Sequence, residues 1–388
     1  MLALLATAEV LGMSLWFAAS AVSGQFRALW SLTIAETAWL TTSVQLGFVA
    51  GTALAAVLNL ADIVPARVYF AGSAVLGALA NAALLAAPDL RTGLLCRFLT
   101  GFFLAGVYPP AMKMAATWFR ADRGLAIGVI VASLTVGKAM PYLVRSADVS
   151  GVRTVLLAAS AGAVLAGILV GVGYRDGPDG FPRRPFSWRL VGTVAGHRET
   201  RLATGGYLGH MWELYAMWTW VPVFLAASAA QRAAQGDAVP VASVYLLAFG
   251  TIAIGGLGAI WGGWAARRHG YSRVVIWAMT ASGLCSLAVG LVFGSSLWVV
   301  APVVLVWGFF VVADSAQFSA LVTEVAPPHA VGTALTLQTS LGFLLTMVTI
   351  QLVPALVDLA GWRLAFPILA LGPAAGIAAI RRLGVRHS

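Results

Sequence analysis

The sequence predicts an all-helical membrane protein with twelve transmembrane helices in two parallel six-helix repeats. Three observations predict this fold class: the composition, the length of the apolar runs, and a repeat between the two halves. Of the 388 residues, 60% are hydrophobic and only 10% are charged, whereas soluble domains carry roughly 25% charged residues. The mean hydropathy is +0.89. These values exclude a soluble globular protein and a disordered chain.

Twelve apolar runs are each long enough to cross a bilayer, whose hydrocarbon core of about 30 Å needs about 20 helical residues. Helices are expected because lipid offers no partner for unpaired backbone groups, and the alternating pattern of barrel strands is absent. The first run ends in a segment resembling a signal-peptide cleavage site, but no basic residues precede it, so we expect it to remain a span. The expected spans lie near residues 1–22, 36–60, 67–88, 92–118, 123–145, 153–174, 202–228, 239–265, 273–294, 297–324, 330–357 and 363–380.

Arginine is distributed unequally between the loops on the two sides of these spans. With the N-terminus taken as cytoplasmic, the inside loops hold fifteen arginines and the outside loops six. Because basic residues concentrate in cytoplasmic loops, both termini are expected in the cytoplasm. The net charge of +10 is therefore mainly a topology signal, and no nucleic-acid partner is expected.

The two halves of the chain share residues at a nearly constant offset. Span 1 reads Glu-Val-Leu-Gly-Met-Ser-Leu-Trp from residue 9, and span 7 reads Glu-Leu-Tyr-Ala-Met-Trp-Thr-Trp from residue 213, an offset of 204. Arg-Val recurs at 67 and 273, and Gly-Phe-Phe recurs at 101 and 308, with offsets of 206 and 207. A duplication of six spans in parallel is typical of secondary transporters. We expect an N-terminal bundle at 1–174, a cytoplasmic interdomain loop at 175–201 and a C-terminal bundle at 202–388.

With this repeat, the whole chain resembles the major facilitator superfamily. The loop motif of that family, Gly-x-x-x-Asp-Arg-x-Gly-x-Arg, is degenerate here. After span 2, Asp62 and Arg67 hold their places, and after span 8, Arg268 and Arg273 do so while Arg267 replaces the acid. The resemblance implies that this loop latches the cytoplasmic gate. We therefore expect Asp62, Arg67, Arg268 and Arg273 to be gate residues.

Span 4 contains the second part of the resemblance. It reads Arg97-x-x-x-Gly101-x-x-x-x-Gly106-x-Tyr108-Pro-Pro-x-x-Lys113, and it is most similar to the branch of anion:cation symporters and nitrate porters. The glycine-rich signatures of nitrate porters are not evident, so nitrate is not carried over. This resemblance implies a small anionic substrate.

Seven ionisable side chains lie inside the expected spans, where a charge costs about 2.5–3.5 kcal/mol on insertion scales. The only two lysines of the chain are among them. Spans 3, 6, 9 and 12 carry none, and in the resembled family these helices are peripheral while spans 1, 4, 7 and 10 line the cavity. The seven residues are Glu9, Arg97, Lys113, Lys138, His210, Glu213 and Asp314.

Two interpretations of these charges stand side by side. Three cations and three acids can simply neutralise each other, because buried charges are normally paired. Alternatively they form a switching network, since apolar packing could replace purely structural pairs. In the second case Arg97, Lys113 and Lys138 are donors to an anionic substrate. Proton coupling then involves an acid of the set Glu9, Glu213 and Asp314, with His210 either a relay beside Glu213 or a hydrogen-bonded core histidine.

Aromatic and sulfur-containing side chains accompany these charges. An aromatic wall for a planar or methylated substrate is expected, with interface and core packing as the ordinary alternative. Its members are Trp16, Trp212, Trp218, Trp220, Tyr207 and Tyr215, and Tyr108 is a further expected substrate contact. A soft-metal site would draw on His210, Met13, Met211 and Met217, although methionine in apolar helices usually packs. Cys96 and Cys285 lie in apolar runs, which excludes a disulfide framework, and no cofactor or resident metal is expected.

The leading hypothesis is a secondary active transporter that moves a small anionic solute by alternating access, coupled to protons. Its expected partners are the solute, protons and the lipid bilayer, and a monomer suffices. The alternatives are proton-driven efflux of cationic or amphipathic drugs through Glu9, Glu213 and Asp314, a copper carrier, and a channel or sensor. An enzyme is not expected, because nucleotide-binding, triad and metal-hydrolase motifs are missing. We expect a multi-pass protein of a bacterial inner membrane.

Overall fold

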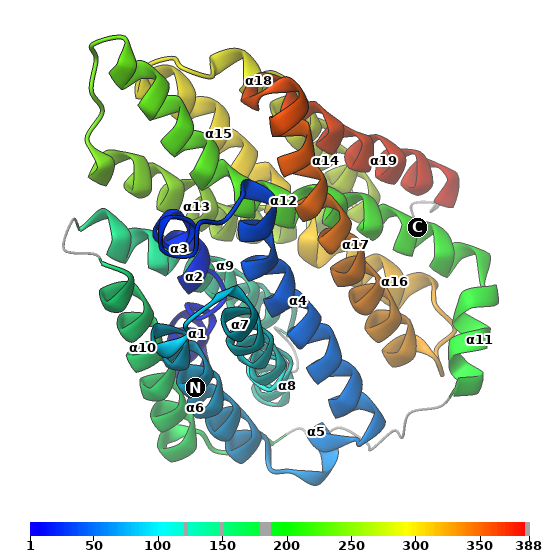
Figure 1. Ribbon diagram of the computed structural model, residues 1–388. Coiled ribbons are helices and arrows are strands. Elements are labelled where there is room, and N and C mark those ends of the chain that lie inside the picture. Colours follow the sequence, from blue (N-terminus) through cyan, green and yellow to red (C-terminus); the bar gives the residue numbers. More distant parts are fainter. Residues whose placement is uncertain (120–122, 148–150, 179–187, 385–388) are drawn as a thin grey trace. The chain divides into compact units, whose positions relative to one another are not determined.

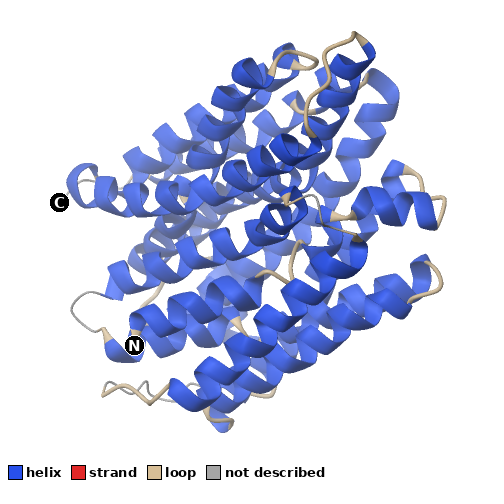
Figure 2. Ribbon diagram, turned by 90° about the vertical axis from the view of Figure 1, so that its left-hand side faces the viewer, coloured by secondary structure: helices blue, strands red, loops and turns tan. Residues whose placement is uncertain are grey.

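The computed structural model describes residues 1–119, 123–147, 151–178 and 188–384. For Ala61, Asp62, Arg123, Gly124 and Trp188 only the backbone is described. Within these ranges every regular element is a helix and none is a strand (Figure 2). The predicted all-helical fold class is confirmed.

Nineteen α-helices and three short 3-10 helices follow one another in the described ranges. They are α1 (Leu2–Met13), α2 (Ala18–Ala21), α3 (Ser23–Leu29), α4 (Ile34–Val57), α5 (Leu60–Ile63), α6 (Ala66–Ala83), η1 (Leu84–Ala86), α7 (Leu90–Leu104), α8 (Tyr108–Trp118), α9 (Arg123–Ser146), α10 (Val152–Gly173), α11 (Trp188–Gly196), α12 (Arg198–Ala234), α13 (Val241–His269), α14 (Tyr271–Ala288), η2 (Val289–Val292), α15 (Leu297–Ala313), α16 (Ser315–Val325), α17 (Val331–Ala360), α18 (Trp362–Ala365), η3 (Pro367–Ala370) and α19 (Leu371–Leu383).

Ten helical segments of the described chain are long and apolar enough to cross a membrane. The shortest has 21 residues, which at about 1.5 Å per residue spans roughly 32 Å, enough for a hydrocarbon core of about 30 Å. Two further segments complete the twelve expected spans. One is the first span, of which only α1 is a continuous apolar helix, and the other is α12, which carries His210 and Glu213 within its 37 residues.

Several of the expected spans are broken. The first divides into α1 and α2, the fourth into α7 and α8, the tenth into α15 and α16 at Asp314, and the twelfth into α18, η3 and α19. The break in the fourth span precedes Pro109 and Pro110, which occupy the first turn of α8. Backbone N–H groups in the first turn have no acceptor within the helix, so a proline there costs no helical hydrogen bond. Pro141, in contrast, lies inside the continuous helix α9. Breaks expose backbone carbonyls that other groups must satisfy.

The chain divides into two compact units. Unit 1 comprises Met1–Pro185 and Pro240–Ala253, and unit 2 comprises Phe186–Val239 and Ile254–Ser388. The first half of α13 therefore packs with unit 1, and its second half belongs to unit 2.

Within unit 1, α4 packs along α7, α6 packs on α10 and α7, and α1 packs on α9 and α10 (Figure 1). Glycine permits the closest of these contacts. A Cβ atom at Gly101 would overlap the backbone carbonyl oxygen of Val44, and one at Gly47 would overlap that of Phe98. The backbones of α4 and α7 thus approach each other at two levels, as small residues allow in membrane helices.

Unit 2 repeats this kind of packing. Helix α12 lies along α19 and α17, and α14 lies along α15 and α19 (Figure 1). A Cβ atom at Gly209 would overlap the carbonyl oxygen of Gly372, so α12 and α19 touch backbone to backbone. These contacts hold α12 firmly, and α12 contains the ionisable residues His210 and Glu213.

Candidate functional site

In unit 1, Arg97 forms hydrogen bonds to the first span at the point where its helix is interrupted. Its side chain is fully buried, and its guanidinium donates to the backbone carbonyls of Leu15 (3.2 Å), Trp16 and Leu40 (3.3 Å). Leu15 and Trp16 lie between α1 and α2, where the helix is interrupted. A planar guanidinium with five donors suits such a cluster of acceptors.

Asn81 completes the surroundings of Arg97. Its side-chain oxygen accepts a hydrogen bond from Arg97 at 3.1 Å, and its amide nitrogen donates to the Leu156 carbonyl and the Ser160 hydroxyl. Arg97 therefore bonds to protein acceptors from spans 1, 2 and 3. This arrangement differs from the expected role as a substrate donor, and we do not carry Arg97 into the proposed site.

Lys138 lies in α9 against an aromatic ring of the first span. Its side chain is 1% exposed, and its Nζ atom lies 4.1 Å from the centroid of the Trp16 ring. The Trp16 ring also packs edge-on against Phe48, with 5.1 Å between the centroids. An ammonium over an indole face gains a cation–π attraction that grows when water is excluded. The sequence predicted both residues as site residues, and the structure brings them together.

Glu9 is the acid associated with this lysine. Helices α1 and α9 approach each other closely beside Glu9 and Lys138. A Cβ atom at Gly137 in α9 would lie 2.6 Å from the carbonyl oxygen of Val10 in α1. The charges of Glu9 and Lys138 attract each other. Glu9 is fully buried, and neither of its carboxylate oxygens has a hydrogen-bond partner among the described residues.

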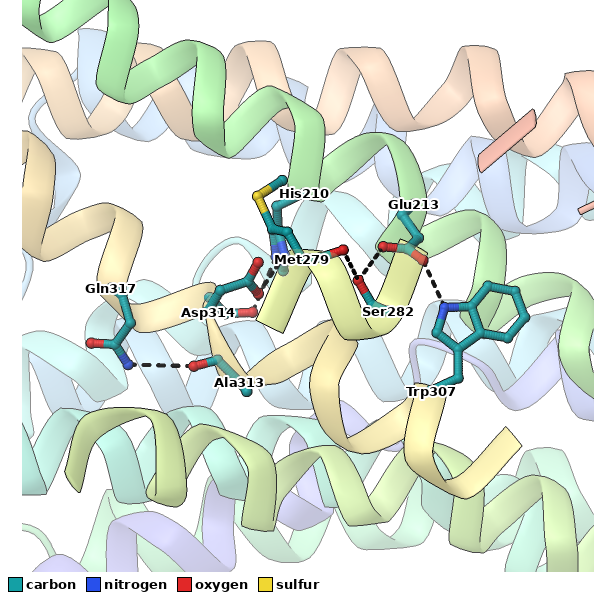
Figure 3. A network of polar contacts seen from close by, with 9 residues as sticks. His210, Glu213, Met279, Ser282, Trp307, Ala313, Asp314 and Gln317 are labelled. Atoms are coloured by element: carbon teal, nitrogen blue, oxygen red, sulfur yellow. Dashed lines mark hydrogen bonds and ion pairs between the residues drawn. The ribbon is translucent and has the colours of Figure 1, made fainter. Parts of the chain in front are cut away.

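Glu213 is fully satisfied in unit 2. Its Oε1 atom accepts a hydrogen bond from Trp307 Nε1 of α15 at 2.7 Å, and its Oε2 atom accepts one from the Ser282 hydroxyl of α14 at 2.7 Å (Figure 3). The Ser282 Oγ atom also lies 3.3 Å from the carbonyl oxygen of Met279. Glu213, Ser282 and Trp307 are each no more than 2% exposed.

His210 bridges the break in the tenth span. Its Nδ1 atom lies 2.9 Å from Asp314 Oδ1 (Figure 3). Its Nε2 atom lies 3.1 Å from the Ser315 hydroxyl. The rings of Tyr207 and Phe318 pack against the imidazole, with centroids 5.9 and 5.5 Å away. His210 therefore contacts Asp314 rather than Glu213, although Glu213 was its expected relay partner.

The remaining predicted substrate residues lie in varied surroundings. Tyr108 and Lys113 are partly buried in α8. Tyr215 is buried against Trp218 and Phe343, with ring centroids 5.2 Å away in each case. Trp220 is buried and donates its ring N–H to the Ile350 carbonyl at 2.9 Å. Tyr215 and Trp220 thus form part of the packed interior of unit 2.

The predicted gate residues lie at helix ends. Arg67 in α6 and Arg273 in α14 are exposed, and Arg268 in α13 stacks over Trp264, with 4.4 Å between the guanidinium carbon and the ring centroid. The side chain of Asp62 is outside the described part of the chain. The gate role of these residues stays a prediction.

The residues of the predicted soft-metal set are divided between the two units, and the set stays a prediction. Both ring nitrogens of His210 face protein partners, Asp314 and Ser315. Met211 and Met217 are buried in α12, and Met13 is buried in unit 1. Among the described residues no group of three or more His, Cys, Asp or Glu side chains could hold a metal ion.

Sequence reasoning missed four residues that satisfy the buried charges. Asn81 bonds to Arg97, Ser282 and Trp307 bond to Glu213, and Ser315 bonds to His210. Serine and tryptophan occur throughout this chain, so their identity alone carries no signal. A search for polar residues on the helices expected to pack on spans 4 and 7 would have ranked them higher.

Helical segments long enough to span a membrane, with buried ionisable groups in both units, define a polytopic carrier of the secondary-transporter class. The family model described as "Major Facilitator Superfamily" matches residues 2–244, and the chain belongs to this superfamily. It is therefore a multi-pass membrane transporter and not an enzyme, and its fold supports secondary transport by alternating access. Transporters of this family generally act as monomers on small molecules.

Solved structures with the same fold extend this comparison over the whole chain. A mutant of the nucleoside transporter NupG matches with a TM-score of 0.77 and 13% identity, covering 98% of this chain and 99% of that one. A bacterial homolog of the human lysosomal transporter Spinster, inward-facing and unoccupied, matches with a TM-score of 0.71 and 15% identity, covering 99% and 94%. The occupied form of that homolog matches with the same TM-score and 14% identity. No curated protein sequence matches the chain.

Proposed function

We propose that this transporter moves a small anionic solute together with protons. The observation that carries the proposal is the grouping of Lys138, Trp16 and Glu9 in unit 1. Lys138 is a buried ammonium, and a buried cation is costly unless an anion or another polar group compensates it. The Lys138 ammonium lies over the Trp16 ring and is attracted by the negative charge of Glu9.

Glu9 links this cation to protons. An ionised, buried carboxylate with no hydrogen-bond donor among the described residues depends on the charge of Lys138 for its stabilisation. A proton on Glu9 removes that negative charge, and a solute anion can then replace it as the counter-charge of the Lys138 ammonium. Loss of the proton restores the attraction between Glu9 and Lys138 and expels the anion. Binding of the anion and of the proton are thereby linked.

The surroundings of the pair suit a small, singly charged solute. Trp16 supplies a flat apolar face next to the ammonium, and Tyr108 and Lys113 in α8 remain proposed contacts. The arginine distribution of the sequence supports cytoplasmic termini, and a bacterial inner membrane is the proposed location. One chain contains both repeats, so a monomer suffices.

A ligand screen on the purified protein tests the substrate class. Inorganic and organic anions, amines and soft metal ions are compared by the thermal stability that each confers. A ligand that binds only the folded protein at one hundred times its dissociation constant stabilises it by about 2.7 kcal/mol. We expect an anion to stabilise the wild type, to lose this effect in Lys138→Ala, and to retain part of it in Lys138→Arg.

Thr135 provides the matched control in the same helix. It is buried, and its hydroxyl bonds to the Val131 carbonyl of its own helix. Thr135→Val is therefore expected to respond to the anion as the wild type does. Stabilisation by amines alone, unchanged in Lys138→Ala, would contradict the proposal and favour efflux of cationic or amphipathic drugs. Stabilisation by Cu(I) alone would favour the copper carrier.

A further inference from the structure

We propose that Glu213 binds and releases a second proton during the transport cycle, and that the hydroxyl of Ser282 reverses its hydrogen bond to accommodate both states. This inference rests on the proposed function for the use of that proton in transport. The protonation itself can be tested without a substrate.

The geometry around Glu213 satisfies an ionised carboxylate. Trp307 Nε1 can only donate, and it lies 2.7 Å from Oε1. The Ser282 hydroxyl lies 2.7 Å from Oε2 and can also donate. Two donors thus face the two oxygens of the carboxylate, one from α15 and one from α14 (Figure 3).

The same atoms also satisfy the protonated acid. A hydroxyl has one hydrogen and two acceptor lone pairs. When Oε2 carries the proton, it donates to Ser282 Oγ, and the Ser282 hydrogen turns to the Met279 carbonyl oxygen, 3.3 Å away. Trp307 continues to donate to Oε1. When a proton binds or leaves Glu213, rotation of the Ser282 hydroxyl therefore keeps every buried polar atom of the group paired. A buried polar atom without a partner would cost about 1–3 kcal/mol.

Neither of the other buried acids has this arrangement among the described residues. Glu9 lacks a hydrogen-bond donor for both oxygens, and its state is linked to the charge of Lys138. Asp314 faces His210 at 2.9 Å, so its state is linked to that of the imidazole. Glu213 is the acid whose two protonation states are both supported by neutral groups of fixed position.

Other titratable groups near Glu213 are few. On α12 itself, His210 lies one turn earlier, and Asp314 between α15 and α16 contributes a like charge. Cys285 on α14 feels the charge of Glu213. The other elements packed on α12 carry their ionisable side chains near helix ends: Glu324 in α16, Asp358 in α17, Arg381 and Arg382 in α19, and Arg189 in α11. The short helix η3 has none.

Infrared difference spectroscopy of the purified, full-length protein tests the proposal. Protonated carboxyl groups have a C=O stretching band that ionised ones lack. We expect a band that titrates with pH in the wild type and is missing in Glu213→Gln. In Ser282→Ala both forms lose the hydroxyl, but its bond to the charged carboxylate is the stronger of the two, so the midpoint should move to higher pH by about one unit.

Ser286 is the control for the hydroxyl. It lies one turn further along α14, is fully buried, and bonds to the Gly283 carbonyl at 2.8 Å. Ser286→Ala should leave the band and its midpoint unchanged. A titrating band that persists in Glu213→Gln, or equal shifts in Ser282→Ala and Ser286→Ala, would overturn the proposal.

The proton-to-solute stoichiometry of transport distinguishes a failure of this inference from a failure of the proposed function. In proteoliposomes the number of protons per solute should fall by one in Glu213→Gln, while exchange of solute across the membrane continues. If the wild type moves solute without protons, the proposed function fails, and the infrared titration still decides the protonation of Glu213. If the wild type is proton-coupled and its stoichiometry is unchanged in Glu213→Gln, the second proton is refuted.

Discussion

At Arg97, a single guanidinium joins the break of the first span to spans 2 and 3. Its hydrogen bonds to the carbonyls of Leu15 and Trp16 lie where the helix is interrupted between α1 and α2. Because Trp16 in turn lies under Lys138, the position of the Lys138 ammonium depends on this bond network. Arg97 is thus a positioning residue for the proposed anion site.

Replacement of Arg97 by methionine should destabilise the protein. Interhelical hydrogen bonds in membrane proteins contribute about 0.6 kcal/mol each, so the loss of four amounts to about 2–3 kcal/mol. Thermal unfolding in detergent should show a lower midpoint temperature for Arg97→Met, whereas Arg91→Met, at an exposed position of the same helix, should match the wild type. Equal stability of Arg97→Met and Arg91→Met would contradict the bonding role.

The sequence predicted which residues are ionisable and buried, but not how they pair. Placement within apolar runs was sufficient to find Glu9, Lys138, Glu213 and Asp314. The pairing depends on helix rotation and on the breaks in spans 1 and 10, which no periodicity in the chain predicts. Arg97 illustrates the difference, because two of its acceptors are backbone carbonyls at the point where a helix is interrupted.

At the scale of the elements, glycine sets the closest helix contacts. Gly137 and Gly342 lie in such contacts, since a Cβ atom on either would overlap an atom of a neighbouring helix. A Cβ atom on Gly128 or Gly332 would meet nothing within 4 Å among the described residues. Composition identifies candidate glycines, but only the rotation of each helix decides which of them face a neighbour.

A pair of glycine variants tests the α4–α7 contact. In Gly101→Ala the added methyl group would overlap the Val44 carbonyl, and such overpacking costs about 1–3 kcal/mol. In Gly72→Ala the methyl group meets nothing within 4 Å, and the better helix propensity of alanine favours the variant by up to about 1 kcal/mol. We expect a lower unfolding midpoint for the first variant only. Similar midpoints for both would contradict the close packing.

At the scale of the whole molecule, the internal repeat placed one buried glutamate in each unit. Glu9 and Glu213 stand 204 residues apart in matching spans. Their surroundings have diverged, because Glu9 is associated with a lysine while Glu213 faces a hydroxyl and an indole. The proposed transport cycle assigns a proton to each.

Hydropathy predicted the number of spans and their order. A run of about twenty apolar residues in lipid must satisfy its own backbone hydrogen bonds, and a helix does so within a single run. The division 1–174, 175–201 and 202–388 remains a proposal for the functional domains. The compact units include Pro240–Ala253 with the first unit, and such packing between distant segments leaves no trace in local sequence. The branch of the family and the solute likewise depend on side-chain contacts rather than on the fold.

Proton-driven uptake into proteoliposomes tests the central claim of proton-coupled anion transport most directly. An anion selected by the stability screen is supplied outside, at a pH below that of the interior. The account predicts accumulation above the external concentration, its collapse when a protonophore is added, its loss in Lys138→Ala and its retention in Thr135→Val. Uptake that stops at the external concentration, with the same rate with and without the pH gradient, would contradict it.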